Sequence, residues 1–202
     1  TELQGVIGGI YAREDGLPEA VWKAIYYQYQ PVGVEPQQPP TAVQLGDAAL
    51  VWAALSVADK VDTLVGLFAA GEQPTGTRDP FALRRAAQGL VKVLVDLPEV
   101  GGVARPVALD AILATSRQAY ADQGTVADVE ARTQALGAFI VERLRFLCEK
   151  RGYRADEIAA VLPEGQGMAG VAPLSVRQRL DALRTVRPSD DFEPLAALFK
   201  RA

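Results

Sequence analysis

Residues 58–90 have the sequence ADKVDTLVGLFAAGEQPTGTRDPFALRRAAQGL, which predicts two helices joined by a turn-rich loop. Apolar residues recur there at three- and four-residue spacing, the period of a helix that buries one face; they are Val57, Val61, Leu64, Leu67 and Phe68. Gly71 is expected to end this first helix. The second helix is expected to begin behind Asp79 as its N-cap, with Pro80 in the first turn, where a missing N–H costs nothing.

The same helical period extends along the rest of the chain, and no alternating strand pattern with hairpin signals appears. Helices are predicted at 2–13, 17–29, 41–70 (one helix, or two that meet near 46–47), 80–97, 106–122, 126–151, 155–162, 174–186 and 191–202. Prolines predict an extended, turn-rich segment at 32–40, and glycines with prolines predict a loop at 163–173. The fold class predicted from these patterns is all-α.

The loop and the two helices around it resemble the beta subunit of the bacterial heterotetrameric glycyl-tRNA synthetase. The resemblance rests on ADKVDTLVG (58–66), GEQPTGTRDP (71–80) and FALRRAAQGL (81–90), and on the flanking matches ELQGVIGGIYA (2–12), QYQP (28–31) and LFKRA (198–202). It implies a multi-helix bundle similar to the HD phosphohydrolases at 1–162. A linker loop at 163–173 would follow, and 174–202 would form the first helices of an anticodon-binding helical domain, truncated here.

The resemblance also implies a function for the whole enzyme. That enzyme ligates glycine to tRNA(Gly) with ATP and Mg²⁺, and both adenylate formation and transfer take place on the alpha subunit. The beta subunit binds tRNA and is needed for assembly of the heterotetramer. The expected partners are therefore the alpha subunit and tRNA(Gly), with no membrane and no DNA, and this fragment is expected to be catalytically inert and to bind no cofactor itself.

The composition and the chain ends are those expected for a fragment of a larger cytoplasmic protein. The net charge is −4, so no global basic field indicates nucleic acid, and any RNA contact must come from local patches. The longest apolar run, Ala48 to Ala58, is well short of the roughly 20 residues of a membrane helix. Cys148 is the single cysteine, which favours a reducing compartment. The chain begins at Thr1 and ends inside a helical pattern, so we expect it to have been cut from a longer protein at both ends.

The absence of histidine argues against hydrolase chemistry. HD phosphohydrolases bind their metals through histidines and aspartates, and this chain contains no histidine. Gln28 stands where some relatives of the family have histidine, and Asp59 occupies the position similar to the remaining acid. No metal site and no catalytic residue are therefore predicted. Two other hypotheses remain: an active HD-type metal phosphohydrolase or nucleotide-sensing domain, and a purely structural interaction domain.

Two sets of charged residues are candidate site residues. Asp59, Lys60 and Asp62 are candidates for a structural ion pair, with Asp59 facing Arg84 or Arg85 across the loop; the alternative is a solvated helix face. Guanidinium and ammonium groups bind phosphate, so nine basic residues are candidates for tRNA binding: Arg78, Arg84, Arg85, Arg143, Lys150, Arg151, Arg177, Lys200 and Arg201. Internal pairing and compensation of helix dipoles are the alternatives for this second set.

Overall fold

The computed structural model describes residues 3–35, 40–122, 129–189 and 192. Over these residues the regular elements are all helices, so the predicted all-α class is confirmed. The helices are α1 (Gln4–Glu14), α2 (Glu19–Tyr27), α3 (Ala42–Leu45), the 3₁₀ turn η1 (Gly46–Ala48), α4 (Ala49–Ala69), α5 (Leu83–Val95), α6 (Leu97–Gly101), α7 (Leu109–Asp122), α8 (Val129–Lys150), α9 (Ala155–Val161) and α10 (Pro173–Val186).

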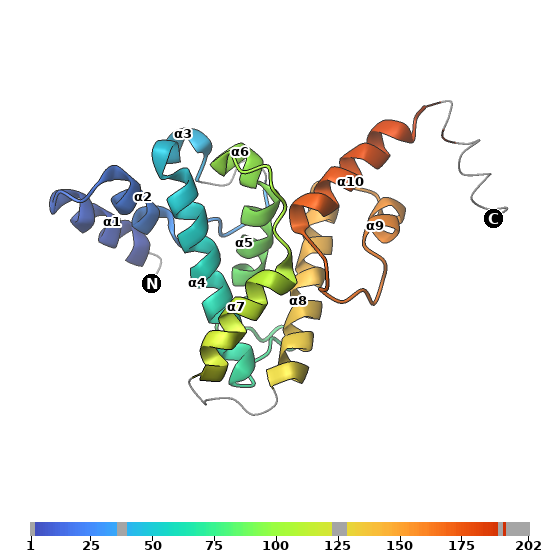
Figure 1. The fold of residues 1–202 in the computed structure, drawn as a ribbon, viewed down its shortest axis with the longest axis horizontal. Coiled ribbons are helices and arrows are strands. Elements are labelled where there is room, and N and C mark those ends of the chain that lie inside the picture. Colours follow the sequence, from blue (N-terminus) through green and yellow to red (C-terminus); the bar gives the residue numbers. More distant parts are fainter. Residues whose placement is uncertain (1–2, 36–39, 123–128, 190–191, 193–202) are drawn as a thin grey trace.

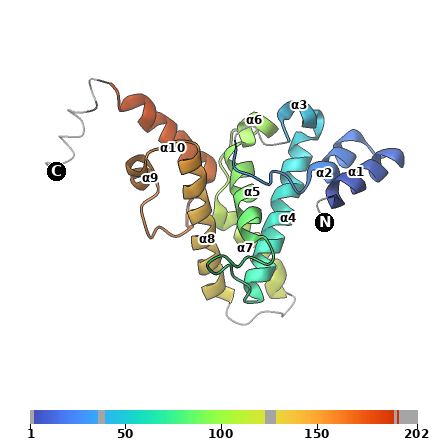
Figure 2. The same cartoon turned by 180° about the vertical axis from the view of Figure 1, so that it is seen from behind.

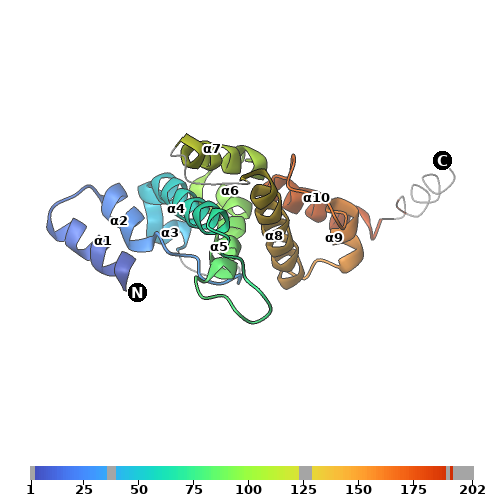
Figure 3. The ribbon, with the colours of Figure 1, turned by 90° about the horizontal axis from the view of Figure 1, so that it is seen from below.

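The centre of the molecule is formed by α4, α5 and α8, which pack against one another, with α7 lying across α4 and α8 (Figure 1). Leu64 of α4, Leu90 of α5 and Leu144 of α8 are fully buried there, because each helix turns its apolar face inward. The pair α1–α2 lies at one end of the elongated molecule, and the pair α9–α10 lies at the other (Figure 3).

The α1–α2 pair depends on a close approach of two helices. A Cβ added to Gly9 would lie 2.5 Å from the Cβ of Tyr26 and 2.9 Å from the carbonyl oxygen of Trp22. Only glycine therefore lets α1 approach α2 this closely. The outer side of α1 leaves Ile7 and Tyr11 exposed.

Two predicted helix boundaries around Asp79 and Pro98 are wrong. The helix predicted at 80–97 begins at Leu83, after a turn at 79–82 in which Ala82 has a left-handed φ of 55°. Asp79 still caps this helix, because its carboxylate accepts hydrogen bonds from the backbone N–H groups of Leu83 (2.8 Å) and Arg84 (3.0 Å). Pro98 does not close the helical region, since it lies in the first turn of α6, where no N–H donor is required.

The remaining boundaries agree with the sequence patterns to within a few residues. The helical stretch 41–70 is divided at Gly46, whose φ of +52° ends α3 before α4 begins. The helix predicted from 106 begins at Leu109. Apart from residue 192, the predicted helix at 191–202 lies outside the described residues, as do the first residues of the one at 126–151.

The predicted loop at 163–173 is packed onto the bundle. The backbone N–H of Gly170 donates to the Asp110 carboxylate (2.9 Å), and the N–H of Leu109 donates to the carbonyl of Val171 (2.9 Å). Both bonds join the loop to the start of α7. The following helix, α10, packs on α9 and on α5, so the loop leads back to the bundle (Figure 1).

Candidate functional site

A groove of about 720 Å³ opens between the segment after α2, the middle of α4 and the start of α5. In Figure 2 the segment after α2 and the loop that leads into α5 lie on the same side of the molecule. The groove is lined by Tyr29, Gln30, Pro31, Val32, Asp59, Lys60, Thr63, Phe81, Ala82, Arg85 and Ala86. The sequence stretch that predicted the fold therefore supplies two of its three walls.

One stripe of α4 fixes the wall formed by the segment after α2. Trp52, Ser56 and Lys60 are four residues apart and therefore share a helix face. Trp52 Nε1 donates to the carbonyl of Tyr27 (2.9 Å), and Ser56 Oγ donates to the carbonyl of Gln30 (3.1 Å). Tyr27 is the last residue of α2, where carbonyls lack partners within the helix, and Gln30 lies three residues beyond it. The stripe thus satisfies them and holds the chain after α2 against α4.

Lys60 is the charged member of this stripe and is only 5% exposed. Its Nζ donates to the carbonyls of Gln28 (3.0 Å) and Gln30 (3.3 Å) and to Ser56 Oγ (2.7 Å). An ammonium has three donors, so all of them are used inside the protein. The ammonium also lies at the negative end of the α2 dipole, which favours a cation.

Gly89 of α5 makes room for the Lys60 side chain. A Cβ at this position would lie 2.6 Å from Lys60 Cε and 2.8 Å from the carbonyl oxygen of Pro31. Burial lowers the pKa of Lys60 to about 8, and the neighbouring Asp59 carboxylate offsets part of this effect. The ammonium is therefore held in place by geometry and not by a tight ion pair.

Asp59 and Asp62 do not form the ion pair that the sequence suggested. Within the described residues, no ion pair joins Asp59 to Arg84 or Arg85, and the half-buried Asp59 carboxylate faces the groove instead. Burial raises its pKa, and Lys60 opposes that rise only in part. Asp62 lies one turn further along α4, where it accepts a hydrogen bond from the Tyr120 hydroxyl (3.0 Å). The expected partners are engaged or placed elsewhere, since Arg84 donates to the carbonyl of Gly76 and Arg85 is exposed to solvent.

The three arginines of the loop region have different roles. Arg84 Nη2 donates to the carbonyl of Gly76 (2.7 Å) and so fixes the loop. Arg85 is exposed and lines the groove. Arg78 is exposed in the loop, where its backbone pairs with Thr75 through two hydrogen bonds of 2.8 and 3.0 Å. Of these three, Arg78 and Arg85 present their guanidinium groups to solvent.

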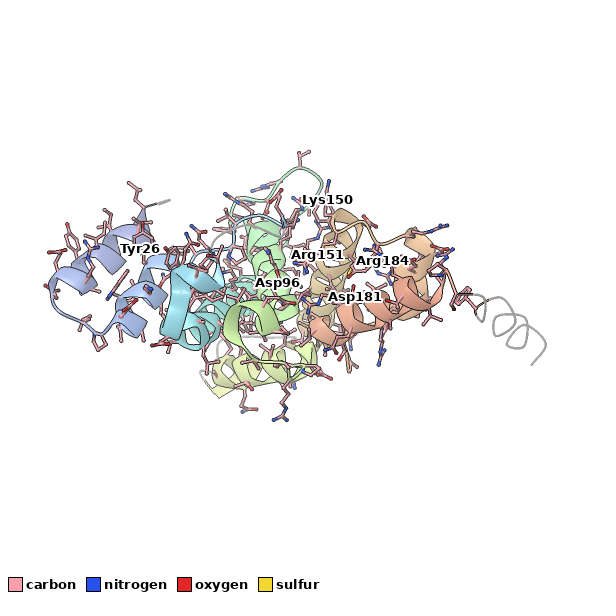
Figure 4. The ribbon with its side chains drawn as sticks, turned by 90° about the horizontal axis from the view of Figure 1, so that it is seen from above. Tyr26, Asp96, Lys150, Arg151, Asp181 and Arg184 are labelled. Atoms are coloured by element: carbon pink, nitrogen blue, oxygen red, sulfur yellow. The ribbon has the colours of Figure 1, made fainter. Side chains whose placement is uncertain are left out.

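Arg151 and Arg177 belong to a cluster around Asp96 that sequence reasoning missed. The Asp96 carboxylate lies 2.7 Å from Lys92 Nζ, 2.7 Å from Arg151 Nη2 and 3.6 Å from Arg177 Nη1. Burial alone would raise the pKa of Asp96, but the hydrogen bonds from Arg151 and Lys92 lower it overall. Figure 4 shows Asp96 beside Arg151, near the place where α5, α8 and α10 meet. These two arginines therefore have internal partners.

The basic residues of α8 and of the C-terminus complete the predicted set. Arg143 pairs with Glu142, and its guanidinium lies over the rings of Phe139 and Phe146 at 5.8 and 5.6 Å. Lys150 lies 5.4 Å from the Phe146 ring and is exposed (Figure 4). Lys200 and Arg201 lie outside the described residues.

The donor set does not fit the metal centre of an HD hydrolase. Among the described residues, no group of three or more His, Cys, Asp or Glu side chains is placed to hold a metal ion. The full sequence has no histidine. Cys148 is buried, and burial raises the pKa of its thiol to about 11, which disfavours the thiolate that binds metals.

No described helix is long and apolar enough to cross a bilayer.

Comparison with known proteins identifies the family. The family model described as "Glycyl-tRNA synthetase beta subunit" matches residues 1–163. This chain belongs to that family. The glycine–tRNA ligase beta subunit of Acidobacterium capsulatum is 41% identical over 100% of this chain and 26% of the relative. That of Acidithiobacillus ferrooxidans is 41% identical over 99% of this chain and 26% of the relative. That of Photorhabdus laumondii is 36% identical over 100% of this chain and 26% of the relative.

The chain therefore spans about a quarter of the length of these glycyl-tRNA synthetase beta subunit relatives. The resemblance in residues 58–90 pointed to this family correctly. The side chains that build the groove were less visible in the sequence. Ser56 looks like an ordinary helix residue there, and its role comes from its position four residues before Lys60 on the same face. Gly89 also looks ordinary, and its role comes only from its position opposite Lys60 in the fold.

Proposed function

We propose that this chain is a tRNA-binding, non-catalytic part of a cytoplasmic glycine–tRNA ligase. The observation that supports it is the lining of the groove, which combines two exposed aromatic side chains with an exposed arginine. Such a lining is suited to an anionic ligand with aromatic rings. It is not suited to activating water, which in an HD hydrolase requires a metal held by imidazole and carboxylate ligands.

In this proposal, the catalytic steps take place elsewhere in the enzyme. The alpha subunit would form the glycyl adenylate with ATP and Mg²⁺ and transfer glycine to tRNA(Gly). The chain's nearest match to a phosphate loop, GEQPTGT at 71–77, lacks the lysine that would reach the β- and γ-phosphates. The beta subunit would contribute tRNA contacts and assembly with the alpha subunit.

Only part of the basic set remains available for RNA in this proposal. Arg151 and Arg177 are engaged with Asp96, whereas Arg78, Arg85 and Lys150 are exposed to solvent. With a net charge of −4, the chain as a whole repels a polyanion. We therefore expect few phosphate contacts, concentrated on the loop and groove side of the molecule.

Titration of labelled tRNA(Gly) with this chain at several salt concentrations tests the proposal. We expect the affinity to fall as salt rises, because each phosphate contact releases a counterion. Arg78→Gln should reduce the slope of log affinity against log salt by roughly one. Arg105→Gln is a matched control, since Arg105 is exposed between α6 and α7 and does not line the groove. The absence of salt-dependent binding would support a purely structural interaction domain instead.

A further inference from the structure

The groove carries three side chains that remain exposed at its mouth. Tyr29 is 39% exposed and Phe81 is 48% exposed, although both are large and apolar enough to be buried. Arg85 has no hydrogen bond or ion pair within the described residues. Phe81 and Arg85 are not required for the packing of the core, whereas the Tyr29 ring packs on one side against Gly5 of α1 and leaves its remaining surface open to the groove.

Lys60 fixes the groove but does not offer a donor to a ligand. Its three protons are taken by the carbonyls of Gln28 and Gln30 and by Ser56 Oγ. Because these carbonyls flank Tyr29 in the sequence, Lys60 holds the backbone that carries this aromatic ring. Lys60 is therefore a positioning residue, and the side chains left to meet a ligand are those of Tyr29, Asp59, Phe81 and Arg85.

These four side chains define the chemistry of the ligand. Exposed aromatic rings stack on nucleobases. A free guanidinium binds a phosphate with two parallel hydrogen bonds. An ionised carboxylate only accepts hydrogen bonds, so Asp59 selects a base edge that donates. Guanine offers two adjacent N–H donors on its Watson–Crick edge, and no other standard base presents such a pair to one carboxylate. The volume of about 720 Å³ is within the range of small-molecule sites and accommodates a nucleotide.

We infer that this groove binds a single unpaired guanosine nucleotide of an RNA. The base stacks on Tyr29 or Phe81 and donates to the Asp59 carboxylate, and the phosphate binds Arg85. The inference rests on the proposed function, in which the natural ligand is tRNA, and it adds the site and the kind of nucleotide.

Binding of two short labelled RNAs tests this inference. One probe is an oligouridine with a single central guanosine, and the other is an all-uridine oligomer of the same length. We expect the guanosine probe to bind the chain about tenfold more tightly, since a bidentate base contact contributes roughly that much discrimination. Fluorescence anisotropy of both probes gives the two affinities.

Groove variants separate the contributions. Tyr29→Ala and Phe81→Ala should identify the stacking residue, at which truncation weakens binding of the guanosine probe about tenfold. Asp59→Asn should abolish the preference for guanosine and leave binding of the uridine probe unchanged. Arg85→Gln should lower the salt slope by roughly one. Tyr11→Ala and Arg105→Gln are the matched controls, because both residues are exposed and lie outside the groove.

The outcomes distinguish this inference from the proposed function. Equal affinity for the two probes, or a guanosine preference that survives Asp59→Asn, would overturn the inference. If tRNA(Gly) binds and the groove variants bind it like the parent chain, the inference fails and the proposed function stands. If the guanosine probe binds and tRNA(Gly) does not, the groove is confirmed as a nucleotide site and the proposed function fails. Circular dichroism of each variant, with Phe81→Leu as a milder substitution, shows whether a loss of binding is a loss of fold.

Discussion

Lys60 and Asp96 are both buried charges, but they are stabilised in different ways. Asp96 has three cations around it, at 2.7, 2.7 and 3.6 Å: Lys92 of α5, Arg151 directly after α8, and Arg177 of α10. Lys60 has two backbone carbonyls and a hydroxyl as partners, and the neighbouring Asp59 lines the groove. Around Asp96, the three cations are paired with a carboxylate inside the protein. Around Lys60, the charged side chains of Asp59 and Arg85 remain available to a ligand in the groove.

The difference indicates that Asp96 stabilises the packing of the helices, whereas Lys60 shapes a candidate binding groove. A paired carboxylate among cations joins helices and is costly to break. A lone ammonium among carbonyls fixes a local backbone segment and remains sensitive to pH. This contrast explains why Arg151 and Arg177 are poor candidates for tRNA contact, while the groove near Lys60 is a good one.

The largest effect is expected from Asp96→Ala. Removing the carboxylate leaves Lys92, Arg151 and Arg177 without their common partner, which should cost about 3–5 kcal/mol of unfolding free energy. Urea unfolding followed by circular dichroism measures it. The control is Glu99→Ala, because Glu99 is exposed and pairs with the same Arg177 at 2.7 Å. That change should cost less than about 1 kcal/mol, and equal losses would remove the contrast between the two regions.

The second effect concerns the pH dependence of stability at Lys60. Its folded pKa of about 8 lies below its ordinary value of 10.5. Between these values the unfolded chain holds a proton that the folded chain has released, so stability rises with pH. The full gain is about 3 kcal/mol by the linkage relation. Asp96 affects stability at acidic pH instead. Because its folded pKa is lowered, its contribution to the free energy of unfolding is present above the ordinary value of 3.8 and is lost as pH falls below that value.

Unfolding free energies of the parent chain and of Lys60→Met measure this effect. Both should carry Cys148→Ala, because the raised pKa of the Cys148 thiol lowers stability as pH rises above the ordinary thiol value of 9.0. The stability of the parent chain relative to Lys60→Met should rise between pH 8 and pH 10.5. If the difference in unfolding free energy between the two proteins is constant across that range, burial does not lower the pKa of Lys60.

Much of the fold follows from the sequence, and the site follows only in part. Apolar periodicity places the helices, because burial of one face is what orders them. The start of α5 was missed because Asp79 caps a helix that begins four residues later, at a distance that N-cap rules do not cover. The role of Gly89 could not be predicted, because apolar periodicity does not show that the Lys60 side chain of α4 packs against this position of α5. The Asp96 cluster joins residues up to 81 positions apart in the chain (from 96 to 177), and charge spacing along one helix does not reveal it.

The third effect tests the fit of Lys60 against α5. Gly89→Ala places a methyl group 2.8 Å from the Pro31 carbonyl and 2.6 Å from Lys60 Cε, which should cost about 1–3 kcal/mol. Thermal unfolding measures the loss. Gly101→Ala is the control, since its nearest neighbour would be Leu97 Cδ2 at 3.9 Å, and it should change stability by less than about 0.5 kcal/mol. Similar results for both substitutions would indicate that Lys60 and Pro31 move aside easily.

The smallest effect separates the neighbouring residues Arg84 and Arg85. Arg84→Ala removes the hydrogen bond to the carbonyl of Gly76 and should cost about 1 kcal/mol, a value reduced by partial exposure. No buried carboxylate is left behind, because Asp59 is not its partner. Arg85→Ala should change stability by less than about 0.5 kcal/mol, as surface changes usually do. Thermal unfolding of both variants, together with their tRNA affinity over a range of salt, tests the pair. If Arg85→Ala lowers stability and leaves the salt dependence of tRNA binding unchanged, Arg85 stabilises the fold and does not contact the ligand.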